Sequence, residues 1–352
     1  MERVISKKTD GDLFSWVKQD DQTLIAFSLQ GRSHKKDNIP LQDNHAIRIL
    51  PNGWKLLVVC DGVGSKPHSD EGAEIAANAF ADFIAKFFGS YLDDNSVLNL
   101  LKCAAHYATG EMCQRASLKN NNIHNYNTTL HAVIFANGIV YYFHSGDGGI
   151  IALTEEGVFK RLTEPQKDEQ YVVPLLAGPE QWEVGKADFC AQSVLLCTDG
   201  VYDKLAGSIL KKYGEEIDKG ICTFFLNPWC FDSWDNPKMI AEKMSLVFTD
   251  RAQPNDFYQI VAKGIAQGKA EGENEASIFV RDWIYNENYP LAALQGIQDD
   301  ITVAIVQNTA ERPACRPMEE FKGPDWETIS REVYRKLYGI KEKTKKEILK
   351  IV

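Results

Sequence analysis

Short runs of apolar residues, rich in β-branched side chains and bounded by Gly, Asn or Asp, recur along much of the chain. Runs of this length and composition predict buried strands. The predicted strands cover residues 23–30, 45–50, 55–60, 129–136, 139–145, 149–153, 193–198 and 301–306. Asn52-Gly53 and Asn137-Gly138 predict tight turns that join neighbouring strands into antiparallel hairpins.

Two segments between these strands have apolar positions at helical spacing. They cover about residues 70–88, with Ser69 or Asp70 as the expected N-cap, and about residues 95–118. The polar residues 31–38 are expected to form a loop. Because the order lacks βαβ alternation, it predicts antiparallel sheets with helices on their outer faces, a layered α+β architecture.

The chain divides into a main domain, residues 1–310, and a C-terminal helical extension, residues 311–352. Within the main domain, residues 206–295 are an aromatic-rich helical insertion, which we expect to pack on the edge of a sheet. Helices are predicted there near residues 237–248 and 254–268. For the lysine-rich extension, packing on the protein body is favoured over a membrane-surface role.

Composition narrows the class of protein. A net charge of −10 argues against a general nucleic-acid-binding protein, which would normally present a basic face. The chain shows no signal-peptide pattern and no apolar stretch long enough to cross a bilayer, so no membrane partner is expected. The 8 cysteines include no Cys-x-x-Cys pair, so we expect reduced thiols, a cytoplasmic location and no zinc site.

Acidic residues stand at the ends of three predicted strands. Asp61 and Asp199 each follow such a strand, and Asp299-Asp300 precedes another. A single Asp-Gly pair can simply form a turn. A carboxylate at the end of a buried strand is costly unless it is paired, hydrogen-bonded or bound to a cation. The three sites together therefore predict one cluster of hard oxygen ligands, which suits Mg²⁺ or Mn²⁺.

This set of motifs resembles the metal-dependent protein phosphatases of the protein phosphatase 2C type, and a bacterial branch in particular. The resemblance spans about residues 23–307. The motifs that carry it, in family order, are Gln42-Asp43, Asp61-Gly62-Val63-Gly64-Ser65, Asn127-Thr128-Thr129, Gly146-Asp147, Thr198-Asp199-Gly200 and Asp299-Asp300-Ile301-Thr302-Val303. It implies a four-layer αββα sandwich with the metal centre at one end.

The resemblance also implies ligand roles. Asp61 would bridge two Mn²⁺ or Mg²⁺ ions, with the Gly62 carbonyl on one of them. Asp199 and Asp299 would hold the other ion, and Asp43 would act through metal-bound water. A water bridging the ions would attack phosphorus in line, so no phosphoenzyme forms. Because side chains alternate along a strand, the aspartate after Asp299 cannot point at the same site without a bulge.

Other positions implied by the resemblance concern a third ion and the substrate. Asp147 matches a ligand of a third, weaker metal in some bacterial relatives, together with Asp199. Val63 stands where many eukaryotic members have a histidine, and Gly148-Gly149 replaces a Ser-Arg pair. Arg32 is our candidate for binding the substrate phosphate, since a guanidinium suits bidentate phosphate contacts. His34 and His68 are expected to border the site, and His34 is a second candidate for binding the phosphate.

The sequence thus predicts a metal-dependent serine/threonine protein phosphatase that acts on a phosphorylated protein, such as a cognate Ser/Thr kinase or its targets. The alternative is a pseudophosphatase, a binding or regulatory module that keeps the fold but does not turn over. A third possibility, a metal-dependent hydrolase for a small phosphate ester, differs in substrate rather than in chemistry. The missing histidine and arginine favour the alternative. The joint presence of Asp61, Asp199 and Asp299 favours the enzyme.

Overall fold

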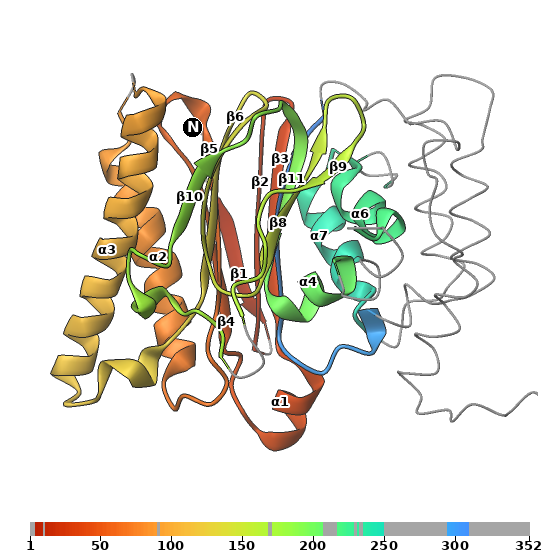
Figure 1. The fold of residues 1–352 in the computed structure, drawn as a ribbon. Helices are drawn as coiled ribbons and strands as arrows, with labels where there is room; N and C mark the ends of the chain where they lie inside the picture. The colour runs from red at the N-terminus through yellow and green to blue at the C-terminus, as the bar shows by residue number, and fades with distance from the viewer. Residues whose placement is uncertain are drawn as a thin grey trace, which may run out of the picture.

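The computed structural model describes residues 4–9, 11–89, 92–167, 171–206, 217–228, 231, 235–249 and 294–309. At its centre two antiparallel β-sheets pack face to face, with helices outside each sheet (Figure 1). This arrangement confirms the predicted four-layer αββα sandwich. The described residues do not include the predicted boundary at residue 310 or the C-terminal extension, so both stay predictions.

Within the described residues, the two sheets have seven and five strands. In spatial order, the first sheet contains β1 (Ile5–Thr9), β2 (Asp12–Gln19), β3 (Gln22–Leu29), β12 (Ile301–Asn308), β11 (Ala191–Cys197), β8 (Gly149–Thr154) and β9 (Phe159–Arg161). The second contains β10 (Glu183–Lys186), β7 (Ile139–Ser145), β6 (Leu130–Ala136), β5 (Lys55–Asp61) and β4 (Asp43–Ile49). The first sheet brings β12, from the end of the described chain, between β3 and β11.

The α-helices form the two outer layers, apart from a short helix at one end of the sandwich (Figure 1). Helices α2 (Ser69–Phe87) and α3 (Asp94–Leu118) cover the second sheet, whereas α4 (Asp199–Leu205), α6 (Lys219–Leu226) and α7 (Pro237–Leu246) cover the first. The short helix is α1 (Arg32–Asp37), and three 3₁₀ turns lie at Pro51–Gly53, Ile123–Tyr126 and Leu175–Ala177.

Three apolar layers hold the sandwich together. Between the sheets, Leu57 and Val59 of β5 pack in one cluster with Val194, Leu196 and Val306 of the other sheet, all fully buried. Further clusters fill the space between each sheet and its helices. Since β5, β11 and β12 are buried on both faces, their near-continuous apolar runs are explained, and their ends meet at the edge of this common core.

The strongest sequence signals are confirmed. All eight predicted strands are present, and both predicted hairpin turns have left-handed backbone at their Asn and Gly. At Asn52-Gly53 the φ angles are 75° and 77°, and at Asn137-Gly138 they are 49° and 87°. Two consecutive residues with positive φ match the right-handed twist of the flanking strands.

No sequence pattern indicated the N-terminal hairpin, and the expectation of a loop over residues 31–38 is wrong. Strands β1 and β2 pair in register, but β2 buries only Ser15 and Val17, so no apolar alternation marks it. In place of the loop is α1, which buries none of its residues and therefore shows no helical periodicity. Asn38, with φ 56°, ends this helix in the left-handed conformation.

Two further expectations need correction. The N-cap of α2 is His68 rather than Ser69 or Asp70, and its side chain makes no capping hydrogen bond. Helices α6 and α7 pack on the outer face of the first sheet and not on its edge, because their apolar side chains complete the core there. The predicted helix near residues 254–268 lies outside the described residues.

Candidate metal centre

Asp61 ends β5, and two threonines that precede β6 hold its backbone. The Thr129 backbone N–H and the Thr128 hydroxyl both donate to the Asp61 carbonyl oxygen, each at 2.8 Å. The Asp61 N–H donates to the Thr129 hydroxyl at 3.0 Å. These bonds fix the direction in which the Asp61 side chain leaves the strand.

Three carboxylates converge where the two sheets end. Asp147 lies in the turn between β7 and β8, and Asp199 is the first residue of α4, directly after β11. One carboxylate oxygen from each of Asp61, Asp147 and Asp199 lies within 4.8 Å of the other two. Among the described residues, this is the single group of three or more potential ligands with that spacing. Asp43 and Asp299 do not join it.

The raised pKa values of these carboxylates favour the binding of a cation. Burial, followed by repulsion from Asp43 and Asp199, raises the pKa of Asp61 well above its ordinary value. Burial and the charges of Asp147 and Asp299 raise the pKa of Asp199 to about 6. An all-carboxylate donor set in which burial and mutual repulsion raise the pKa values fits a hard divalent ion such as Mg²⁺ or Mn²⁺.

Asp43 stands beside this group at the start of β4, directly opposite Asp61 in the β4·β5 register. It is 3% exposed and accepts a hydrogen bond from the Thr198 hydroxyl at 2.8 Å. Burial and the nearby Asp300 carboxylate raise its pKa well above the ordinary value. Thr198 therefore links Asp43 to the start of α4, where Asp199 begins the helix.

Asp299 and Asp300, which directly precede β12, point in different directions. The Asp299 side chain is 62% exposed, and its charge acts on both Asp61 and Asp199. Asp300 is buried and accepts backbone hydrogen bonds from Gly31 and Gln42, each at 2.6 Å. Asp300 thus ties the loop before α1 to the start of β4, and Asp299 is left to face the site.

Helix α1 brings two of the predicted substrate-binding residues to this end of the sandwich. His34 lies with Nδ1 2.9 Å from Asp300 and Nε2 3.7 Å from Asp299. Arg32 opens the same helix and is half-buried. Ser33, between them, bonds through its N–H and its hydroxyl to the Gln298 carbonyl oxygen. The helix is therefore anchored to the loop that carries Asp299.

His68, the other histidine expected near the site, is held from the α3 side. Its Nε2 is hydrogen-bonded to the Asn121 side chain at 2.9 Å, and its ring stacks on Tyr126 at 5.1 Å. These contacts support a structural role at the start of α2. Of the two histidines, His34 is the one in contact with the acidic residues.

Lys167 is a residue that the sequence did not single out. Its Nζ lies 3.5 Å from Asp147 Oδ2 and 3.4 Å from Asp203 Oδ1. No motif marks it, because its partners are 20 and 36 residues away and meet it only in the folded chain. Its ammonium is the one cation in direct contact with the three-carboxylate group among the ion pairs of the described residues.

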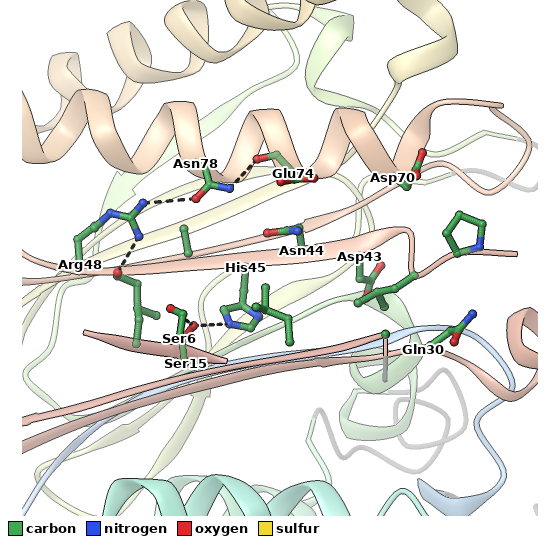
Figure 2. A pocket seen from close by; sticks show the side chains of 16 residues that line it. Ser6, Ser15, Gln30, Asp43, Asn44, His45, Arg48, Asp70, Glu74 and Asn78 are labelled. Atoms are coloured by element: carbon green, nitrogen blue, oxygen red, sulfur yellow. Dashed lines mark hydrogen bonds between the residues drawn. The ribbon is translucent and has the colours of Figure 1, made fainter. Parts of the chain in front are cut away.

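A polar cavity of about 380 Å³ runs along β4 to Asp43. Figure 2 shows His45 between Arg48 and Asp43, with Gln30 beyond Asp43. His45 is fixed by Ser28 at 2.8 Å and Ser15 at 3.0 Å. The cavity reaches Asp43, but Asp61, Asp147 and Asp199 do not line it.

Comparison with known proteins places the chain in a family. The family model for protein phosphatase 2C matches residues 30–219, more than half of the 352-residue chain. The chain belongs to the protein phosphatase 2C family. The matched residues include Asp43, Asp61, Asp147 and Asp199, so most of the candidate centre lies inside the family match. No curated protein matches the sequence.

Several solved structures, among them serine/threonine phosphatases, are similar to this chain. The catalytic domain of the serine/threonine phosphatase PstP, in complex with two manganese ions, is 14% identical, with a TM-score of 0.47 over 81% of this chain and 97% of that one. The S. agalactiae serine/threonine phosphatase is 13% identical, with a TM-score of 0.46 over 81% and 99%. PppA of Pseudomonas aeruginosa is 16% identical, with a TM-score of 0.44 over 81% and 97%.

Proposed function

We propose that this protein phosphatase 2C family member is a metal-dependent enzyme that hydrolyses phosphoserine and phosphothreonine in proteins. The observation that carries the proposal is the convergence of Asp61 and Asp199 at one end of the sandwich, with Asp147 beside them. Their raised pKa values indicate that the charges are poorly balanced without a cation. Phosphoryl transfer depends on positioning and charge neutralisation, which such a centre supplies.

Two Mn²⁺ or Mg²⁺ ions would be held by the ligands that family resemblance implies. Asp61 and the Gly62 carbonyl would hold one ion, Asp61, Asp199 and Asp299 the other, and Asp43 would bind through water. Bound ions of this kind lower the pKa of a coordinated water, so that it can attack phosphorus at neutral pH. Both ions suit all-oxygen sites.

Direct hydrolysis without a cysteinyl phosphoenzyme agrees with the state of the two nearby thiols. Cys60 precedes Asp61 and Cys197 lies two residues before Asp199, and both side chains are fully buried. Burial and the neighbouring aspartates raise the pKa of each thiol well above its ordinary value. A buried, protonated thiol is a poor nucleophile, so neither cysteine is expected to attack phosphorus.

The chain's own residues would bind and orient the phosphate. Arg32 would donate to the phosphate oxygens from α1, with His34 beside it. Asp300 would act indirectly, because it holds the loop before α1 and the start of β4 together. Thr128 and Thr129 would keep the Asp61 backbone rigid while the charge on the phosphate changes.

A phosphorylated protein is the proposed substrate, with a Ser/Thr kinase or its targets as the natural source, in the cytoplasm of a bacterium. No helix within the described residues is long and apolar enough to span a membrane. The cysteines in those residues are free thiols. A reducing compartment agrees with this chemistry.

The test is release of phosphate from p-nitrophenyl phosphate and from a phosphothreonine peptide, with Mn²⁺, with Mg²⁺ and with EDTA. We expect turnover with either ion and none with EDTA. No turnover under any condition, in protein whose circular dichroism shows it to be folded, would contradict the enzyme. That result would favour a pseudophosphatase that binds phosphoproteins, and capture of the phosphopeptide without hydrolysis would then identify it.

A further inference from the structure

Lys167 places its ammonium between two carboxylates at the border of the candidate metal centre. Its Nζ lies 3.5 Å from Asp147 Oδ2, and 3.4 Å and 3.5 Å from the two carboxylate oxygens of Asp203. Asp147 is the residue that family resemblance assigns to a third, weaker metal ion. A cation of the chain itself is therefore already in contact with that ligand.

The fold holds both Lys167 and its carboxylate partners in place. Asp199 and Asp203 lie one turn apart on α4, so their side chains project from the same face of the helix. Gln166, next to Lys167, donates its N–H to the Gly146 carbonyl at 2.7 Å and accepts from the Gly146 N–H at 3.1 Å through its side chain. The backbone beside Lys167 is thus bonded directly to the turn that carries Asp147.

The lysine is charged and partly withdrawn from water. Its side chain is 35% exposed and that of Asp147 is 11% exposed. An ion pair that is shielded on one side contributes more than a fully exposed pair.

We propose that the Lys167 ammonium takes the place of a third metal ion at Asp147, so that the centre of this chain holds two ions and not three. The inference rests on the proposed metal-dependent function. A Mg²⁺ or Mn²⁺ ion needs several oxygen ligands at about 2.1 Å in octahedral geometry. An ammonium that occupies the oxygens of Asp147 and Asp203 removes ligands and adds a repelling charge.

The experiment counts bound Mn²⁺ by isothermal titration and by the loss of the free-ion electron paramagnetic resonance signal. We expect two ions in the wild type and three in Lys167→Met and in Lys167→Gln, since both replacements free the carboxylates. Lys167→Arg keeps the charge and is expected to hold two. The double variant Lys167→Met with Asp147→Asn loses the vacated ligand and is expected to return to two.

Lys186→Met is the matched control. The Lys186–Asp94 ion pair has the same side-chain exposure as the Lys167–Asp203 pair, 35% and 55%, but lies at α3 on the other side of the molecule. We expect this variant to bind two ions. Three ions in the wild type, or two in both neutral Lys167 variants, would overturn the inference. A wild type that binds no ion would instead contradict the proposed metal centre.

Discussion

Gly62 lies so close to Gln42 that a β-carbon at residue 62 would be 2.7 Å from the Gln42 carbonyl oxygen. The same β-carbon would lie 2.7 Å from the Ser69 carbonyl oxygen. Gly62 also donates its N–H to Gln42 at 3.1 Å, so the backbones at the ends of β4 and β5 are in contact. Glycine is required at this position by the close approach of two main chains and not by a positive φ.

Gly62→Ala is therefore expected to separate β4 from the start of α2 and to remove most phosphatase activity, with a loss of unfolding free energy of about 2 kcal/mol. Gly64→Ala is the control in the same loop, since its β-carbon would meet only the Gln42 side chain, at 3.7 Å. Urea unfolding and phosphate release measure both variants. Equal effects of the two substitutions would contradict this explanation.

Substitutions of the neighbours Asp299 and Asp300 should affect different properties. The first should weaken metal binding, and the second should lower stability. Asp300→Ala leaves the N–H groups of Gly31 and Gln42 without their buried acceptor, and we expect it to lower the unfolding free energy by about 3 kcal/mol. Asp299→Ala removes an exposed carboxylate and should change stability by less than about 0.5 kcal/mol while weakening Mn²⁺ binding. Urea unfolding in EDTA and calorimetric Mn²⁺ titration test the pair, and the reverse pattern would refute the two roles.

Asp199 should make the metal-free protein less stable as pH rises. Its pKa is about 6 in the folded chain and about 3.8 ordinarily, so the folded state holds its proton longer than the unfolded state. The stability from this group is complete below about pH 3.8 and is lost as pH rises through 6. Two pKa units correspond to at most about 3 kcal/mol. Asp199→Asn should flatten this part of the pH profile of urea unfolding in EDTA, and identical profiles would refute the shift.

Arg32 is expected to bind the substrate phosphate. Arg32→Ala should raise KM for a phosphothreonine peptide about tenfold and lower kcat much less, because it removes a charge-assisted contact worth about 1.4 kcal/mol. Lys36→Ala, on the same helix and exposed, should leave both constants near the wild-type values. Steady-state kinetics at saturating Mn²⁺ decide the matter. An unchanged KM in Arg32→Ala would remove this residue from the site.

The sequence predicted the fold best where a strand is buried on both faces and where a turn requires particular residues. The apolar run before Asp61 could be recognised as a strand because it is buried on both faces, and the Asn-Gly turns because only particular residues adopt positive φ. Helix α1 carries neither signal, since it buries no residue and is held by bonds from Ser33 to Gln298, far along the chain.

The candidate site could likewise be predicted from the sequence only in part. Asp61 and Asp199 end buried strands, and the structure brings them together. Asp147 joins them more closely than Asp299 does, because the turn after β7 returns to the end of β5. Lys167 could not have been found, since a lysine outside the predicted strands and helices has no pattern that points to partners on another element.

The most direct test of the metal centre is hydrolysis of a phosphothreonine peptide by the wild type and by Asp199→Asn, side by side, with Mn²⁺ and with EDTA. Asp94→Asn, outside the site, serves as the control for loss of a surface carboxylate. We predict Mn²⁺-dependent turnover in the wild type and the control, and at least a hundredfold loss in folded Asp199→Asn, about 2.7 kcal/mol in the barrier. Near-normal turnover in Asp199→Asn, or turnover that persists in EDTA, would contradict the account.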